Sequence, residues 1–138
     1  MGRPFRLRER IRSFGYAFQG IGFMIRSQPN ARVHLLATVV AVGAGLYFQI
    51  SKGDWIGLTL AIMAVWMAEA LNTAVEFLAD VIHPGFHPTI GKAKDVAAGA
   101  VFIAALGAVI VGLWVFVPHV QSSIEFRAIP DAPGQTER

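Results

Sequence analysis

The sequence lacks cysteine altogether and is poor in charged residues. The absence of cysteine excludes disulfide bonds and any site built on a thiolate. Charged side chains make up only 15% of the 138 residues, whereas hydrophobic side chains make up 54%. Because a soluble domain carries about 25% charged residues, this composition, with a mean hydropathy of +0.52, indicates one small integral membrane protein.

Three long apolar segments account for this hydropathy, and we expect transmembrane helices at about residues 31–50, 55–82 and 95–118. The first and third are almost free of charge and close to the ~20 residues that a helix needs to cross the hydrocarbon. The second is polar in its latter half, so it crosses only if those groups face protein or water. The sequence thus predicts an all-α membrane protein, with one domain at residues 1–120 and a disordered polar tail at 121–138.

The N-terminal segment is expected to form an amphipathic helix at about residues 5–27 that lies on the membrane surface. Its apolar residues recur at three- and four-residue spacing, and its arginines are placed to meet anionic headgroups. The plainer interpretation is a juxtamembrane anchor without a catalytic role. Because a mixed stretch and not a compact apolar core follows the basic start, we expect no cleavable signal peptide.

The basic residues are distributed unevenly about the predicted spans. Seven of the twelve lysines and arginines precede the first span, Lys92 and Lys94 lie in the second loop, and Lys52 stands alone in the first loop. By the positive-inside rule, the N-terminus and the second loop are cytoplasmic. The second half of the second span then lies nearest the cytosol.

That half-span carries a stripe of polar residues in the stretch "EALNTAVEFLAD". At about 100° per residue, Glu69, Asn72, Glu76 and Asp80 fall within roughly 80° of one another on a single helix face. Acidic groups at membrane depth cost a few kcal/mol each, so the stripe indicates a cation, a partner or water that compensates them. The alternative is a helix that leaves the membrane early, so that water merely solvates its acidic side chains. Apolar residues that continue to the end of the segment argue against this alternative.

A second polar group opens the third span, where Lys92, Lys94 and Asp95 follow one another closely. Lysines beside carboxylates and a helix N-terminus form a place for phosphate oxygens and a divalent cation. Interfacial lysines that merely snorkel toward the headgroups are the simpler explanation.

Other kinds of site fit the sequence less well. The stretch "GFHPTIGK" has the wrong glycine spacing for a phosphate-binding loop, lacks the following Ser or Thr, and follows a helix. His83 and His87 are spaced like metal ligands, but Pro84 and Gly85 between them break helical geometry. Neither a Ser-His-Asp order with a nucleophile elbow nor a basic-aromatic surface for nucleic acid is present.

The motifs "EALNTAVEFLAD" and, starting fourteen positions after its last residue, "KDVAAGAV" resemble the signature of a known family. It is the small bacterial diacylglycerol kinase and undecaprenol kinase family. The resemblance extends over about residues 11–120 and includes "GYAFQG" in the surface helix. It implies phosphorylation of a membrane lipid alcohol by MgATP, in a homotrimer of the bacterial inner membrane.

The resemblance also implies roles for individual residues. Glu69 corresponds to the general base, and Glu76 corresponds to a magnesium ligand. The other implicated residues arrange ATP and the catalytic glutamate: Tyr16, Asn72, Asp80, Lys94 and Asp95. Phosphoryl transfer needs positioned groups and neutralised phosphate charge more than covalent machinery, and three short spans are too few to enclose both substrates, which favours a site completed by a neighbouring subunit.

One position departs from the family pattern. Where the family usually has a glutamate that shares the metal, this sequence has Gln28. A glutamine still offers a carbonyl oxygen but no negative charge, so the departure predicts weaker magnesium binding at Gln28 or substitution by another carboxylate.

The identity of the lipid rests on shorter stretches. "HPTIGKAKDVAAGAV", "WVFVP" and "NARVH" resemble the undecaprenol kinase branch, which implies undecaprenyl phosphate as the product. Diacylglycerol, giving phosphatidic acid, is the alternative substrate. A non-catalytic membrane subunit or an ion-conducting bundle whose acids bind cations is the alternative of a different class.

Overall fold

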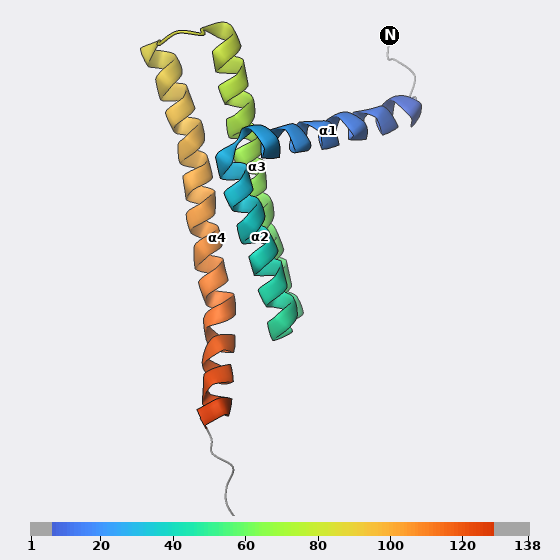
Figure 1. Ribbon diagram of the computed structural model, residues 1–138, viewed down its shortest axis with the longest axis vertical. Coiled ribbons are helices and arrows are strands. Elements are labelled where there is room, and N and C mark those ends of the chain that lie inside the picture. The colour runs from blue at the N-terminus through green and yellow to red at the C-terminus, as the bar shows by residue number, and fades with distance from the viewer. Residues whose placement is uncertain (1–6, 129–138) are drawn as a thin grey trace, which may run out of the picture.

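The computed structural model describes residues 7–128, and these residues form four helices joined by short connections. They are α1 (Leu7–Ser27), α2 (Pro29–Phe48), α3 (Lys52–Ile82) and α4 (Pro88–Ala128). Figure 1 shows α2, α3 and α4 packed alongside one another, with α1 projecting across their direction. Within the described chain α2, α3 and α4 are long and apolar enough to span a membrane, which confirms the predicted all-α architecture with three spans.

A tight turn joins α2 to α3 and starts α3 earlier than residue 55, where the sequence predicted it. Gln49 ends α2 in the left-handed region, with φ 51°. The Ser51 hydroxyl then accepts a hydrogen bond from Asp54 N, and the Asp54 carboxylate accepts one from Ser51 N. This capping box satisfies backbone donors at the start of a helix, so α3 begins at Lys52.

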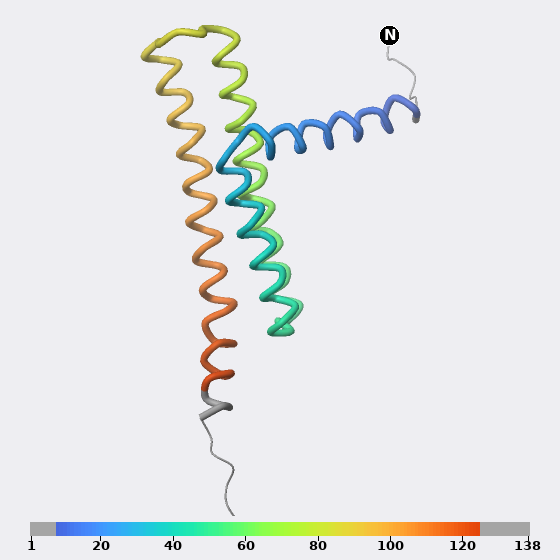
Figure 2. The backbone as a smooth tube through the Cα atoms, in the orientation of Figure 1, coloured from blue at the N-terminus to red at the C-terminus, as the bar shows by residue number. Residues whose placement is uncertain are grey.

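The last helix is longer at both ends than predicted. It begins at Pro88 and not at residue 95, because proline is well suited to the first turn of a helix. It also passes through Pro118 and continues to Ala128, so residues 121–128 are helical although the sequence predicted a disordered tail from 121. The hydroxyl of Ser122 donates to the Pro118 carbonyl at 3.0 Å. Figure 2 shows this end of α4 extending beyond the α2–α3 turn, while residues 129–138 lie outside the described residues.

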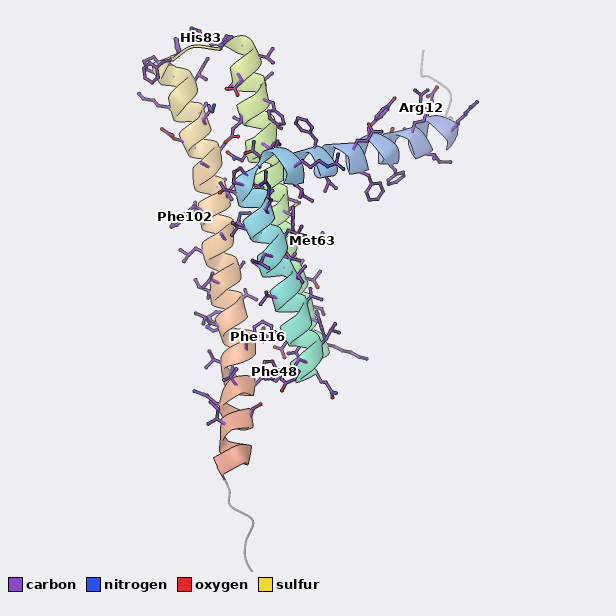
Figure 3. All side chains as sticks on the ribbon, in the orientation of Figure 1. Arg12, Phe48, Met63, His83, Phe102 and Phe116 are labelled. Carbon is purple, nitrogen blue, oxygen red and sulfur yellow. The ribbon has the colours of Figure 1, made fainter. Side chains whose placement is uncertain are left out.

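The largest buried apolar cluster lies near the α2–α3 turn. Ile50, Leu58 and Val115 form its centre and join all three long helices. Figure 3 shows Phe48 and Phe116 close together at this end, with ring centroids 6.3 Å apart. This cluster is far along the bundle from the polar half of α3, so it stabilises the helix packing without taking part in a polar site.

Many large apolar side chains face outward from the bundle. On α4, for example, Phe102 is 70% exposed and Trp114 is 77% exposed. A water-soluble monomer rarely exposes contiguous apolar surface on this scale. The helix surfaces are therefore suited to contact lipid tails or neighbouring chains.

Candidate functional site

A polar face runs along the second half of α3, as the 3.6-residue period predicted. Glu69 is 1% exposed and Asn72 is 4% exposed. Glu76 is half-buried, and the side chain of Asp80 is 67% exposed. The face therefore leads from a fully buried carboxylate, in steps of about one helical turn, to a carboxylate at the surface.

The carboxylate of Glu76 is held by two carboxamides. Gln28 Nε2 donates to Glu76 Oε2 at 2.9 Å, and Asn72 Nδ2 donates to Glu76 Oε1 at 3.3 Å. Gln28 lies at the junction of α1 and α2, where Pro29 starts the second helix and Gln28 N donates to Met24 O at 2.8 Å. The junction is thereby tied to α3, and each oxygen of Glu76 accepts one amide N–H.

At the exposed end of the face, Lys94 on α4 forms a salt bridge with Asp80 on α3. The Nζ to Oδ1 distance is 3.0 Å, and the two side chains are 38% and 67% exposed. Asp95 follows Lys94 but is exposed, and among residues 7–128 it has no hydrogen bond or ion pair. The structure thus brings together Asp80 and Lys94, whereas it gives Asp95 no hydrogen bond or ion pair among the described residues.

Several buried polar atoms in this region have no hydrogen-bond partner in the described chain. They are both carboxylate oxygens of Glu69, Asn72 Oδ1 and the Thr73 hydroxyl. A buried polar group without a partner costs roughly 1–3 kcal/mol, and more when it is charged. Such a cluster on one helix face indicates that a substrate, cation or water satisfies these atoms when the protein is at work.

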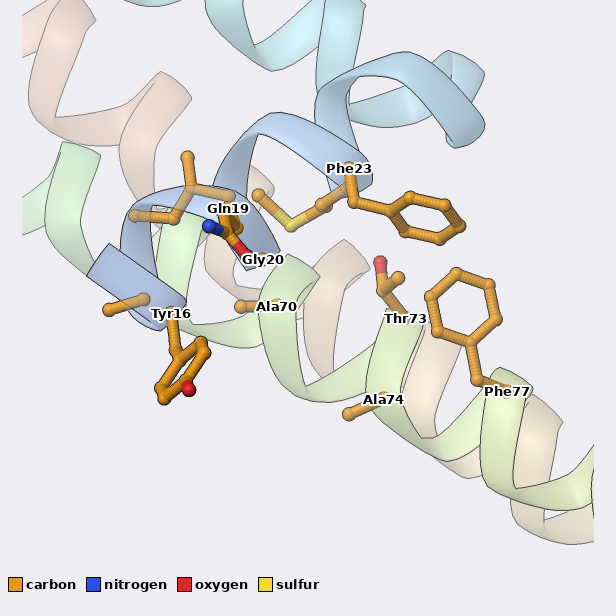
Figure 4. Close-up of a pocket in the computed structure, with 11 residues that line it drawn as sticks. Tyr16, Gln19, Gly20, Phe23, Ala70, Thr73, Ala74 and Phe77 are labelled. Atoms are coloured by element: carbon orange, nitrogen blue, oxygen red, sulfur yellow. The ribbon is translucent and has the colours of Figure 1, made fainter. Parts of the chain in front are cut away.

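A cleft of about 620 Å³ lies between α1 and α3. Figure 4 shows Tyr16 and Phe77 at its two ends, with the unpartnered Thr73 on the α3 side between them. Phe23 meets Phe77 edge to face, with centroids 5.3 Å apart, and Arg12 Nη2 donates to the Tyr16 hydroxyl at 3.1 Å. Tyr16 therefore lies against α3, but on a different side from Gln28 and Glu76.

A smaller cleft, of about 280 Å³, lies among α2, α3 and α4. Its polar lining includes His34, Asn72 and Glu76, and α4 contributes an apolar wall that includes Val101 and Phe102. We call it the α2–α4 cleft. Its two kinds of wall match a molecule with a polar head and a hydrocarbon chain.

Sequence reasoning missed His34 and Thr73, which the structure places at the two clefts. A signal for His34 was available, because it is the one basic side chain between residues 33 and 50, and a polar group inside a span is uncommon. Thr73 gave no such signal, because threonine is common in transmembrane helices and its exposure depends on how α1 packs.

Residues 15–116 match the family described as prokaryotic diacylglycerol kinase. The chain belongs to this family. The match covers the second half of α1, all of α2 and α3, and α4 to Phe116. It therefore includes every residue that lines the two clefts.

Individual relatives divide between two lipids. The undecaprenol kinase of Bacillus subtilis is 35% identical over 110 residues, which cover 80% of this chain and 89% of the relative. The diacylglycerol kinase of Synechocystis is 35% identical over 111 residues, covering 80% of this chain and 63% of the relative. The diacylglycerol kinase of Escherichia coli is 30% identical over 100 residues, covering 72% of this chain and 82% of the relative.

The family membership defines the class of reaction. The chain is a membrane-embedded lipid kinase, that is, a phosphotransferase that acts on an alcohol group, with ATP as the phosphate donor. This agrees with the resemblance seen in "EALNTAVEFLAD" and excludes the alternative of a non-catalytic subunit or ion-conducting bundle.

Proposed function

We propose that this protein transfers the γ-phosphate of MgATP to the hydroxyl of undecaprenol and produces undecaprenyl phosphate. The observation that carries the proposal is the polar face of α3, which leads from buried Glu69 to exposed Asp80. A kinase that joins a water-soluble nucleotide to a membrane alcohol needs one continuous polar path between the two environments. The face supplies that path along a single helix.

Within this proposal Glu69 is the general base. The alcohol oxygen attacks the γ-phosphorus, the bond to the β,γ-bridging oxygen breaks, ADP leaves, and the hydroxyl proton passes to Glu69. Asn72 and Asp95 complete the catalytic group. At 1% exposure, Glu69 contacts substrate only when neighbouring side chains move aside, and the α2–α4 cleft beside Asn72 offers both polar and apolar walls.

The nucleotide is assigned to the exposed end of the face. Lys94 beside Asp80 offers the cation that phosphate oxygens need, and an approaching phosphate competes with Asp80 for it. Tyr16 lies against α3 on the side of α1. Small-molecule pockets usually enclose about 300–1,000 Å³, so the α2–α4 cleft of about 280 Å³ is too small to enclose both ATP and a lipid headgroup.

The divalent cation is assigned to Glu76, with Gln28 as a neutral oxygen ligand. No group of three His, Asp or Glu side chains converges within the described residues, but the two side chains that contact Glu76, Gln28 and Asn72, each carry an amide oxygen. The unpartnered Asn72 Oδ1 is buried beside it, and the Gln28 amide presents Oε1 after a half-turn of its side chain. This donor set fits Mg²⁺, which when bound neutralises phosphate charge.

We further propose that the working enzyme is a homotrimer in the bacterial inner membrane. Apolar helix faces such as the one bearing Phe102 are broadly exposed in the single chain, and Asp95 lacks a partner on the described residues of its own chain. A neighbouring subunit that covers these faces would complete the site. The arginines of α1 support a cytoplasmic N-terminus with the first half of α1 at the membrane surface.

The choice of lipid follows from the likeness to the Bacillus subtilis undecaprenol kinase and from "NARVH" and "WVFVP". Diacylglycerol is the second candidate, because the Synechocystis relative is as similar over an equal share of this chain. Neither cleft contains a feature that measures the length of a lipid chain.

The test is a direct assay of both lipids. Purified protein in mixed micelles is incubated with γ-labelled ATP, Mg²⁺ and either undecaprenol or diacylglycerol, and kcat/KM is measured for each. We expect the higher value for undecaprenol. A higher value for diacylglycerol would transfer the assignment to the second candidate, and equal activity of the parent and Glu69→Gln would overturn the assignment of the base.

A further inference from the structure

The α1 helix is anchored to the bundle through its C-terminal end. Residues 8–21 are all exposed, whereas Met24, near the end of the helix, is 4% exposed. Figure 1 shows the rest of α1 projecting across the direction of the other helices. Burial of an apolar side chain is non-directional, so it does not by itself define the angle at which α1 leaves the bundle. The junction with α2 has to define that angle.

The junction leaves two carbonyl oxygens of α1 without their usual helical donors. Pro29 occupies the position whose N–H would bond the Ile25 carbonyl, but proline has no N–H. Gln28 is extended, with φ −103° and ψ 119°, so the helical ladder is interrupted before the Arg26 carbonyl can be bonded in the same way. The two carbonyls therefore need donors from elsewhere.

Arg32, the fourth residue of α2, supplies both donors. Its Nε donates to the Ile25 carbonyl at 3.2 Å, and its Nη2 donates to the Arg26 carbonyl at 2.8 Å. The two nitrogens belong to one rigid planar group, and the helix dipole also favours a cation at a helix C-terminus. Because hydrogen bonds are directional, two of them to successive carbonyls constrain both the position and the rotation of the last turn of α1. The cap therefore spans the proline break and holds α1 at one angle to α2.

The capped junction carries one of the proposed cation ligands. Gln28 lies in the chain between the capped turn and Arg32, and its side chain donates to Glu76 at 2.9 Å. Its backbone N–H donates to the Met24 carbonyl at 2.8 Å. A change in the cap would therefore move Gln28 relative to Glu76.

The junction also determines where Tyr16 lies. At about 1.5 Å per residue, Tyr16 is about 16 Å from the end of α1, so a rotation of ~10° at Ser27 would move it by ~3 Å. Tyr16 and Ala74 line the same cleft between α1 and α3, and a displacement on this scale would change the width of that cleft. A small error at the cap is thus amplified along α1.

We propose that Arg32 is the positioning residue for α1: its guanidinium caps the C-terminus of that helix and thereby holds Tyr16 beside α3 and Gln28 at Glu76. The proposal rests on the proposed assignment of the nucleotide to the side of Tyr16 and of the cation to Glu76. Arg32 acts through the helix that it caps and is not assigned a contact with substrate.

The first test measures the orientation of α1 and does not depend on activity. Because the sequence has no cysteine, spin labels can be attached at two exposed positions through Ser13→Cys on α1 and Leu60→Cys on α3. Labelled chain is diluted with unlabelled chain before reconstitution into bilayers, and the distance within one subunit is measured by double electron–electron resonance. We expect one narrow distance distribution in the parent. In Arg32→Gln the distribution should be broader or displaced by several ångströms.

The matched control is Arg26→Gln at the same junction. Arg26 is also an exposed arginine, but its side chain has no hydrogen bond or ion pair within residues 7–128, so we expect the parent distribution. Arg32→Lys keeps the charge without the planar fork and should give an intermediate distribution, and it is the milder variant if Arg32→Gln does not reconstitute. The parent distribution in every Arg32 variant that reconstitutes would overturn the proposal.

The second test is kinetic and separates positioning from stability. We expect Arg32→Gln to raise KM for ATP by about tenfold, because the displaced Tyr16 loses about one contact with the nucleotide. The value of kcat at saturating ATP and KM for lipid should stay close to those of the parent. A residue that supported only the fold would instead reduce the active fraction, and so kcat, at an unchanged KM. If KM for ATP is unchanged in Arg32→Gln while Lys94→Met still raises it, the role of Arg32 is refuted and the nucleotide assignment survives.

Discussion

The side-chain amide of Gln28 donates a 2.9 Å hydrogen bond to the Glu76 carboxylate and so ties the α1–α2 junction to the second half of α3. A glutamate at this position would face Glu76 as a like charge unless a cation lay between them. The glutamine lets this chain keep the two segments together without a metal. In the proposed cation site, a glutamine would supply one negative ligand fewer than a glutamate.

Replacement of Gln28 by glutamate is therefore expected to have effects of opposite sign with and without metal. In EDTA the two carboxylates repel and the hydrogen bond is lost, so the free energy of unfolding should fall by about 1–3 kcal/mol. With metal the added charge should tighten Mn²⁺ binding, measured by electron paramagnetic resonance, roughly tenfold. Unchanged Mn²⁺ affinity would show that position 28 is not a ligand position.

Glu69→Gln is expected to separate stability from activity. The substitution removes a buried charge that has no donor in the described chain and keeps the volume of the side chain, so the unfolding temperature should stay constant or rise. The same change removes the proposed proton acceptor and should reduce kcat by about 10² to 10⁴. A loss of activity accompanied by a lower unfolding temperature would instead indicate that Glu69 supports the fold.

Lys94→Met is expected to affect nucleotide binding far more than stability. Its bridge to Asp80 is exposed at both ends, and exposed bridges contribute only about 0.2–1 kcal/mol. Loss of a phosphate-binding cation should raise KM for ATP roughly tenfold or more, measured at saturating lipid. Lys52→Met, which removes the same charge at the opposite end of α3, is the control and should leave KM for ATP unchanged.

Gly45→Ala is expected to disrupt the packing of α2 against α3. A Cβ at this position would lie 2.9 Å from Trp55 Cη2 and 3.1 Å from Ile50 Cδ1, and such overpacking costs about 1–3 kcal/mol. Gly43→Ala is the matched control, since nothing lies within 4 Å of its added Cβ. Replacing a helical glycine there should be neutral or stabilising by up to about 1 kcal/mol. Denaturant titration in micelles distinguishes the two, and equal results would mean that Trp55 does not pack on Gly45.

Local periodicity was enough to predict that Glu69, Asn72, Glu76 and Asp80 share one face of a helix. All four lie on α3, where about 100° of rotation per residue determines the direction of each side chain without reference to any other segment. The transmembrane helices followed from hydropathy, which is likewise a property of each segment alone. The start of α3 was missed because the capping box of Ser51 and Asp54 depends on backbone hydrogen bonds that hydropathy does not register.

The sequence by itself thus determined three apolar helices and a polar stripe on the second of them. Only the tertiary structure decided which residues meet that stripe: Gln28 at Glu76, Lys94 at Asp80, and His34 in the cleft that Asn72 and Glu76 also line. The physical reason is that periodicity describes the faces of one helix, whereas the register between two helices depends on contacts such as Trp66 with Thr38 and Trp55 with Gly45. Those contacts join residues far apart in the chain, so no local pattern contains them.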